Sequence, residues 1–68
     1  MIIIKWTNKY SGETGYVEDV NKKEKHFVNT YDQSQARKYN NAGNARRVIE
    51  SLTSYGEADN NDFELITV

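Results

Sequence analysis

The 68-residue sequence contains no cysteine, no proline and only one histidine. Without cysteine the chain forms no disulfide, no thiolate nucleophile and no cysteine-based zinc or iron-sulfur site. With His26 as the lone histidine, neither a histidine pair for a metal ion nor a serine triad is expected. We therefore expect no metal and no other cofactor, and stability has to come from packing, hydrogen bonds or a partner subunit.

Long hydrophobic runs are missing as well. The longest one, Ile2 to Ile4, is far shorter than the roughly 20 residues of a membrane-spanning helix. Met1 is followed by three Ile and Lys5, and this segment lacks the charged leader, long apolar stretch and cleavage site of a secretory signal. The expected location is therefore the cytoplasm, without membrane contact.

Hydrophobic residues make up only 37% of the chain and the mean hydropathy is −0.88, so disorder is an alternative. Five Tyr, two Phe and one Trp, together with three patterned apolar segments, favour a folded chain, because disordered chains are poor in aromatics. A chain of this length buries only about 60% of its unfolded surface. We expect a single domain over residues 1–68 with a thin core.

The net charge of −1 hides an asymmetry along the chain. All nine Lys and Arg lie in residues 1–49, whereas residues 50–68 carry five acidic residues and no basic one. Such a separation can mark a surface for nucleic acid or another partner. At these modest counts, pairing between the two parts within one fold is the interpretation we favour.

The first half of the chain has the alternating pattern of strands. Residues 2–7, 16–20 and 25–31 are predicted to be strands, because β-branched and aromatic side chains alternate with polar ones. The segment 10–15 supplies two glycines for a hairpin turn, and the polar segment 21–24 suits a second one. A three-stranded antiparallel meander is the result.

Helical signals begin at Asp32. Asp32 with Gln35 three residues later matches a capping box, which predicts a short helix over residues 33–39. Asn41 is expected to cap a second, longer helix over residues 44–55. Gly56 is expected to end that helix in a left-handed conformation.

One apolar stripe and a final strand complete the predicted fold. Ala45, Val48, Ile49 and Leu52 are spaced to form one face of the longer helix, which would cover the sheet. A polar loop over residues 57–62 leads to a strand over 63–68, which we place beside the first strand, parallel in preference to antiparallel. The predicted fold is α+β, a small two-layer sandwich with the order βββααβ.

Carboxylates and glycines offer little chemistry. Glu18 and Asp19 point to opposite faces of a strand, and Asp59 and Asp62 lie in a polar loop, so neither pair is expected to act in acid–base catalysis. His26 is interpreted as an ordinary, partly wet strand residue. The segment 41–44 opens a helix near Arg46 and Arg47; simple capping is favoured there, with a single bound phosphate as the alternative.

Basic residues form small groups that could bind nucleic acid by neutralising phosphates. If they met on one side, bases could stack on Trp6, Tyr16 or Phe27; the favoured alternative is that these aromatics form the core. The candidate nucleic-acid-binding residues are Lys22, Lys23, Lys25, Arg37, Lys38, Arg46 and Arg47.

Tyrosine is favoured at protein interfaces, because it buries a large rigid ring and keeps a hydroxyl group for a hydrogen bond. A small fold with an exposed strand edge could dock on another protein or on its own copy. The candidate protein-binding residues are Tyr10, Tyr16, Tyr31, Tyr39 and Tyr55.

The order of these features also resembles a group of proteins. A meander from Met1, the segment DQSQARKY (32–39), a helix over 44–55 and the closing segment FELITV (63–68) resemble many small uncharacterised proteins encoded by phages and prophages of AT-rich Gram-positive bacteria. The resemblance covers the whole chain and rests on pattern and Asn/Lys-rich composition. It implies a cytoplasmic accessory protein that binds or inhibits a host or phage macromolecule, and it transfers no catalytic residue.

Taken together, these features predict a non-enzymatic interaction module. Its partner would be a protein or a second copy of the chain, recognised by shape and charge complementarity. The alternative is a nucleic-acid-binding module that uses the basic residues. No small-molecule substrate is expected.

Overall fold

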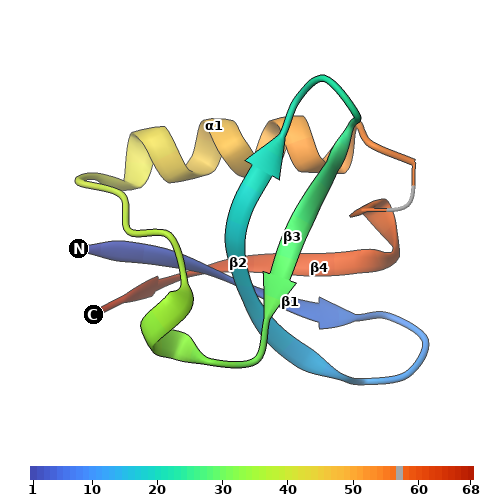
Figure 1. Cartoon of the computed structure of the whole chain (residues 1–68), viewed down its shortest axis with the longest axis horizontal. Helices are drawn as coiled ribbons and strands as arrows, with labels where there is room; N and C mark the ends of the chain where they lie inside the picture. The colour runs from blue at the N-terminus through green and yellow to red at the C-terminus, as the bar shows by residue number, and fades with distance from the viewer. Residues whose placement is uncertain (57) are drawn as a thin grey trace.

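The computed structural model describes residues 1–56 and 58–68, and Glu57, part of the predicted polar loop, lies outside the described residues (Figure 1). The strands form one antiparallel sheet in the order β3-β2-β1-β4. The elements along the chain are β1 (Ile2–Asn8), β2 (Thr14–Asn21), β3 (His26–Thr30), the 3₁₀ helix η1 (Gln33–Gln35), α1 (Ala42–Thr53), the 3₁₀ helix η2 (Ala58–Asn60) and β4 (Asn61–Thr67).

The predicted three-stranded meander is confirmed. In the first turn, Asn8 Oδ1 accepts hydrogen bonds from two backbone amides at 2.9 Å, and Gly12 has a positive φ of 77°. In the second turn, Asn21 Oδ1 accepts from the Glu24 amide at 3.0 Å, and Lys25 has a φ of 58°. These left-handed positions and side-chain bonds reverse the chain within a few residues.

The sheet curls strongly, so that its two outer strands approach one another. Phe27 of β3 and Phe63 of β4 pack edge to face with ring centroids 5.6 Å apart, although two strands separate them in the sheet. An irregularity between Val17 and Asp19 interrupts the β2–β3 register, and such bulges bend a strand. Figure 1 shows the β2–β3 hairpin crossing over β1 and β4 as a result.

Helix α1 covers one face of this curled sheet. Asn41 Oδ1 caps it by accepting from the Asn44 amide at 2.9 Å, as predicted. The predicted stripe faces the core, where Ala45 and Leu52 are fully buried in one cluster with Ile4 and Val17. No helix in residues 1–56 and 58–68 is long and apolar enough to cross a membrane.

The predicted order βββααβ is wrong, although the fold is a small, single-domain α+β structure. The segment 33–39 contains a single 3₁₀ turn in place of a helix, because Asp32 caps Ser34 and the chain then extends at Ala36, where ψ is 137°. Beyond that point Tyr39 forms two backbone hydrogen bonds with Ile2, at 2.9 and 2.7 Å. Pairing with β1 therefore replaces the helical bonds that the capping signal predicted.

The predicted parallel placement of the last strand is also wrong, since β4 runs antiparallel to β1 from Ile2↔Thr67 to Asn8↔Asn61. The Ile2–Tyr39 pairing holds the chain leading into α1 near the start of β1. A helix of 12 residues then spans about 18 Å, roughly the length of a strand, and carries the chain to the far end of β1. There Lys9 N donates to Asn60 O at 2.9 Å, so β4 has to run back.

Two smaller boundaries differ from the prediction. Helix α1 ends at Thr53 with Ser54 as its cap, and Gly56 does not adopt a left-handed conformation. The polar segment that was predicted as a loop forms η2, and β4 already begins at Asn61.

Candidate functional site

Three of the seven candidate nucleic-acid-binding residues meet around one pocket. Lys22 follows the end of β2, Arg37 lies in the extended segment 36–39, and Arg47 projects from α1. We call this site the basic pocket. Its volume is about 180 Å³, and its lining residues are Val20, Lys22, Arg37, Tyr39, Arg47, Val48 and Ser51.

The extended segment places Arg37 in the basic pocket. Arg37 N donates to Val17 O at 3.0 Å, which ties the segment to β2. Its guanidinium carbon lies 5.7 Å from the centre of the Tyr39 ring, and its Nη1 donates to Asp19 Oδ1 at 2.8 Å. The arginine is thus oriented by an aromatic ring and by a carboxylate on β2.

The electrostatics of the basic pocket favour an anion. The pKa of Asp19 is lowered by the hydrogen bond from the Val20 amide and by Arg37, so this carboxylate stays ionised. Its pair with Arg37 is more than half exposed on both sides, and water and salt screen such pairs so that they contribute little to stability. Lys22 and Arg47 form no ion pair within the described part of the chain. Burial raises the pKa of Tyr39, which keeps its hydroxyl group neutral.

Two carboxylates of the acidic C-terminal part form ion pairs with lysines outside the basic pocket. Glu64 lies 3.7 Å from the Lys5 ammonium group across the β1–β4 pairing, and Asp62 of β4 lies 4.0 Å from the ammonium group of Lys9, the residue that follows β1. The predicted pairing of basic and acidic parts within the fold is therefore present along β1 and β4. Neither of these carboxylates lines the basic pocket.

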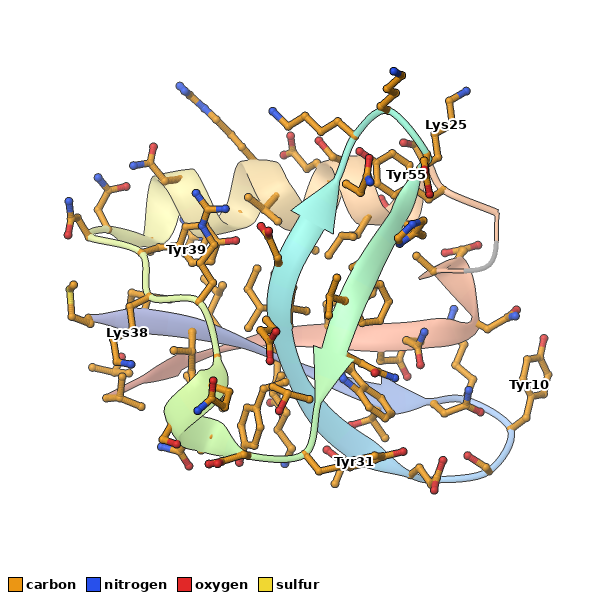
Figure 2. All side chains as sticks on the ribbon, viewed as in Figure 1. Tyr10, Lys25, Tyr31, Lys38, Tyr39 and Tyr55 are labelled. Carbon is orange, nitrogen blue, oxygen red and sulfur yellow. The ribbon has the colours of Figure 1, made fainter. Side chains whose placement is uncertain are left out.

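The other candidate basic residues lie elsewhere. Lys23 and Lys25 belong to the turn between β2 and β3, and Figure 2 shows Lys25 where this turn enters β3. Arg46 is exposed on α1 and does not line the pocket, and Lys38 lines a separate hollow with Gln33, Ser34 and Val68.

The five tyrosines are not brought together. Tyr55 is buried in the core, Tyr39 lines the basic pocket, and Tyr16 donates a hydrogen bond to Gln33 Oε1 at 3.3 Å. Tyr10 and Tyr31 are 83% and 65% exposed and lie apart from Tyr39 and Tyr55 in Figure 2. The tyrosines thus form no single binding face in this fold.

The predicted core role of Trp6 is confirmed. Trp6 is 4% exposed, and its Nε1 donates to Tyr16 O at 3.1 Å. Tyr16 pairs with Lys5 while Trp6 pairs with Gly15, so the two aromatic side chains alternate to opposite faces of the sheet. A stacking surface that combines these two rings is therefore absent.

The sequence did not indicate a second pocket, of about 270 Å³, beside the edge of Trp6. Its residues come from β1, the first turn, β3, η2 and β4, and only the curl of the sheet brings these elements together. We call it the aromatic pocket. Its lining residues are Trp6, Asn8, Glu13, His26, Phe27, Asn29, Tyr31, Ala58 and Asn61.

The remaining candidate groups have ordinary partners. His26 Nε2 lies 3.0 Å from Glu24 Oε2, with the imidazole partly exposed and the carboxylate largely exposed. No group of three or more His, Asp or Glu residues that could hold a metal ion occurs in the described ranges. At the start of α1, Asn41 Oδ1 accepts a hydrogen bond from the backbone amide of Asn44, as simple capping requires.

No family model matches the sequence, and searches of curated proteins and of solved structures also find no match. The resemblance to phage and prophage proteins, and the cytoplasmic location that it implies, therefore stay predictions.

Proposed function

We propose that this protein is a non-enzymatic module that binds nucleic acid through the phosphate backbone. The observation that carries the proposal is the basic pocket, where cations from the turn after β2, from α1 and from the segment 36–39 line one concave site. Among the described residues, no carboxylate lines it. Backbone phosphates are the ligands that such a cluster favours, and they bind independently of base sequence.

The three cations play different parts in this proposal. Arg37 and Arg47 present planar guanidinium groups that can donate two parallel hydrogen bonds to one phosphate, whereas Lys22 acts as a mobile point charge. The hydroxyl group of Tyr39 is an additional donor. Because the Arg37–Asp19 pair is exposed and weak, Arg37 can exchange this partner for a phosphate at little cost.

The size of the site limits the expected affinity. Three phosphate contacts on a single strand give a slope of about −2 in a plot of log K against log salt concentration. We therefore expect weak binding that is measurable at low ionic strength and falls steeply as salt is added.

Fluorescence anisotropy with a labelled single-stranded oligonucleotide, measured across a salt series, tests the proposal. The triple variant Lys22→Gln, Arg37→Gln, Arg47→Gln should lose most of the binding. The matched control Lys23→Gln, Lys25→Gln, Arg46→Gln removes the same charge outside the basic pocket and should retain most of it. Equal losses in the two variants would mean that only net charge matters, and the proposal would be wrong.

A further inference from the structure

The aromatic pocket lies beside the free edge strand β3, on another part of the molecule from the basic pocket. Tyr31, the residue after β3, is 65% exposed, and its ring packs edge to face against Trp6 with centroids 5.8 Å apart. Phe27 contributes a third ring, and Figure 2 shows Tyr31 beside the strand end. Three aromatic rings therefore line one concave site, and only Tyr31 among them is freely accessible.

The charge of the aromatic pocket is opposite to that of the basic pocket. Glu13 supplies a carboxylate, no Lys or Arg is among the lining residues, and the described residues contain no ion pair of Glu13. His26 is also among the lining residues, and its Nε2 lies 3.0 Å from the carboxylate of Glu24, which adds a second negative charge next to the pocket. A phosphate would therefore be repelled from this site, and a cation would be attracted.

The amide groups of the lining also leave acceptors available. Asn61 Nδ2 donates to Ala58 O at 3.2 Å, so its Oδ1 remains for a ligand. Asn29 is exposed, and its side-chain amide has no hydrogen-bond partner among the described residues. With the Glu13 carboxylate, these oxygens can accept several hydrogen bonds from one donor-rich group.

We propose that the aromatic pocket binds an arginine side chain presented by a partner protein. A guanidinium group is planar and permanently charged, and it carries five N–H donors. It can stack on the accessible Tyr31 ring while its N–H groups reach Glu13 and the amide oxygens. Aromatic stacking combined with a charged hydrogen bond is typical of the arginines that anchor protein interfaces. This interaction uses residues other than those of the basic pocket, so it does not depend on nucleic-acid binding.

The test is a titration of the full chain, followed by ¹H–¹⁵N NMR, with a capped Gly-Arg-Gly peptide. Two matched peptides carry lysine or the neutral isostere citrulline in place of arginine. We expect saturable shifts of the Trp6 indole N–H and of the Asn29 and Tyr31 amides, with the arginine peptide binding most tightly. Absence of saturable shifts, equal binding of citrulline or lysine, or tighter binding of free nucleosides would each overturn the proposal.

Two variants locate the site. Tyr31→Ala and Glu13→Gln should each raise the dissociation constant of the arginine peptide about threefold, as expected for the loss of one exposed cation–π or ionic contact. The controls Tyr10→Ala and Glu18→Gln remove an exposed ring and an exposed carboxylate that do not line the pocket. A control that weakens binding as much as its counterpart would contradict the assignment.

Discussion

Gly15 lies directly against the indole ring of Trp6. A Cβ atom added at Gly15 would be 2.6 Å from Trp6 Cζ2 and 2.7 Å from Thr30 O. The first neighbour is a buried core side chain and the second is backbone of the adjacent strand, so neither can move aside easily. Position 15 therefore requires glycine because there is no room for a Cβ atom between Trp6 and Thr30. The conformational freedom of glycine is not needed here, since its φ is not left-handed.

We expect Gly15→Ala to lower the free energy of unfolding by about 1–3 kcal/mol, the usual cost of overpacking. Urea denaturation measures the change. Gly56→Ala is the control, because nothing lies within 4 Å of its added Cβ and its φ is not left-handed. If both alanines had the same effect, the contact with Trp6 would not be limiting.

Asn41→Ala removes the side chain that caps α1. We expect a loss of about 1 kcal/mol in the free energy of unfolding, because the Asn44 amide loses its hydrogen-bond acceptor. The neighbouring exposed Asn40 is not the capping residue, so Asn40→Ala should change stability far less. Thermal unfolding followed by circular dichroism distinguishes the two variants, and equal melting temperatures would exclude the capping role.

Acid should destabilise the fold through two aspartates. Hydrogen bonds from Val20 N and Arg37 lower the pKa of Asp19, and bonds from Ser34 lower that of Asp32. Since the folded pKa lies below the unfolded one, the contribution to stability is present above the ordinary aspartate pKa of about 3.9 and is lost as pH falls through the folded pKa.

Unfolding free energies measured between pH 7 and pH 2 test this dependence. The double variant Asp19→Asn, Asp32→Asn should lose less stability on acidification than the parent protein, because these two groups no longer titrate. Glu18→Gln removes an exposed carboxylate that forms no ion pair within the described part of the chain, and this variant should keep the parental profile. An unchanged profile in the double variant would show that other groups govern acid sensitivity.

Asp19 should also weaken nucleic-acid binding, if the basic pocket is the binding site. Asp19→Asn releases Arg37 from its 2.8 Å hydrogen bond and removes a negative charge beside the pocket. We expect affinity for a single-stranded oligonucleotide to rise about two- to fivefold, equivalent to an exposed ion pair. Glu18→Gln removes the same charge at the neighbouring residue, which does not line the pocket, and should raise the affinity less in the same anisotropy assay. A larger gain in the control would contradict this role of Asp19.

The candidate sites were less predictable than the elements that carry them. The basic residues could be listed from the sequence, but the convergence of Lys22, Arg37 and Arg47 depends on where the segment 36–39 attaches to β2. No local signal marked the aromatic pocket, because its residues are scattered from Trp6 to Asn61. A site formed across a curled sheet has no characteristic spacing along the chain.

Local patterns by themselves determined the three-stranded meander, the two turns and α1 with its Asn41 cap, because each depends on residues only a few positions apart. Tertiary structure alone decided the rest. The Asp32 cap favours a helix in the segment that follows it, but the backbone hydrogen bonds between Tyr39 and Ile2 hold that segment in an extended conformation. The same pairing set the starting point of α1, and the length of that helix then required β4 to run antiparallel to β1. Contacts between residues far apart in the chain outweighed local preference at these places, because the hydrogen bonds and buried area that they provide are absent from any short segment.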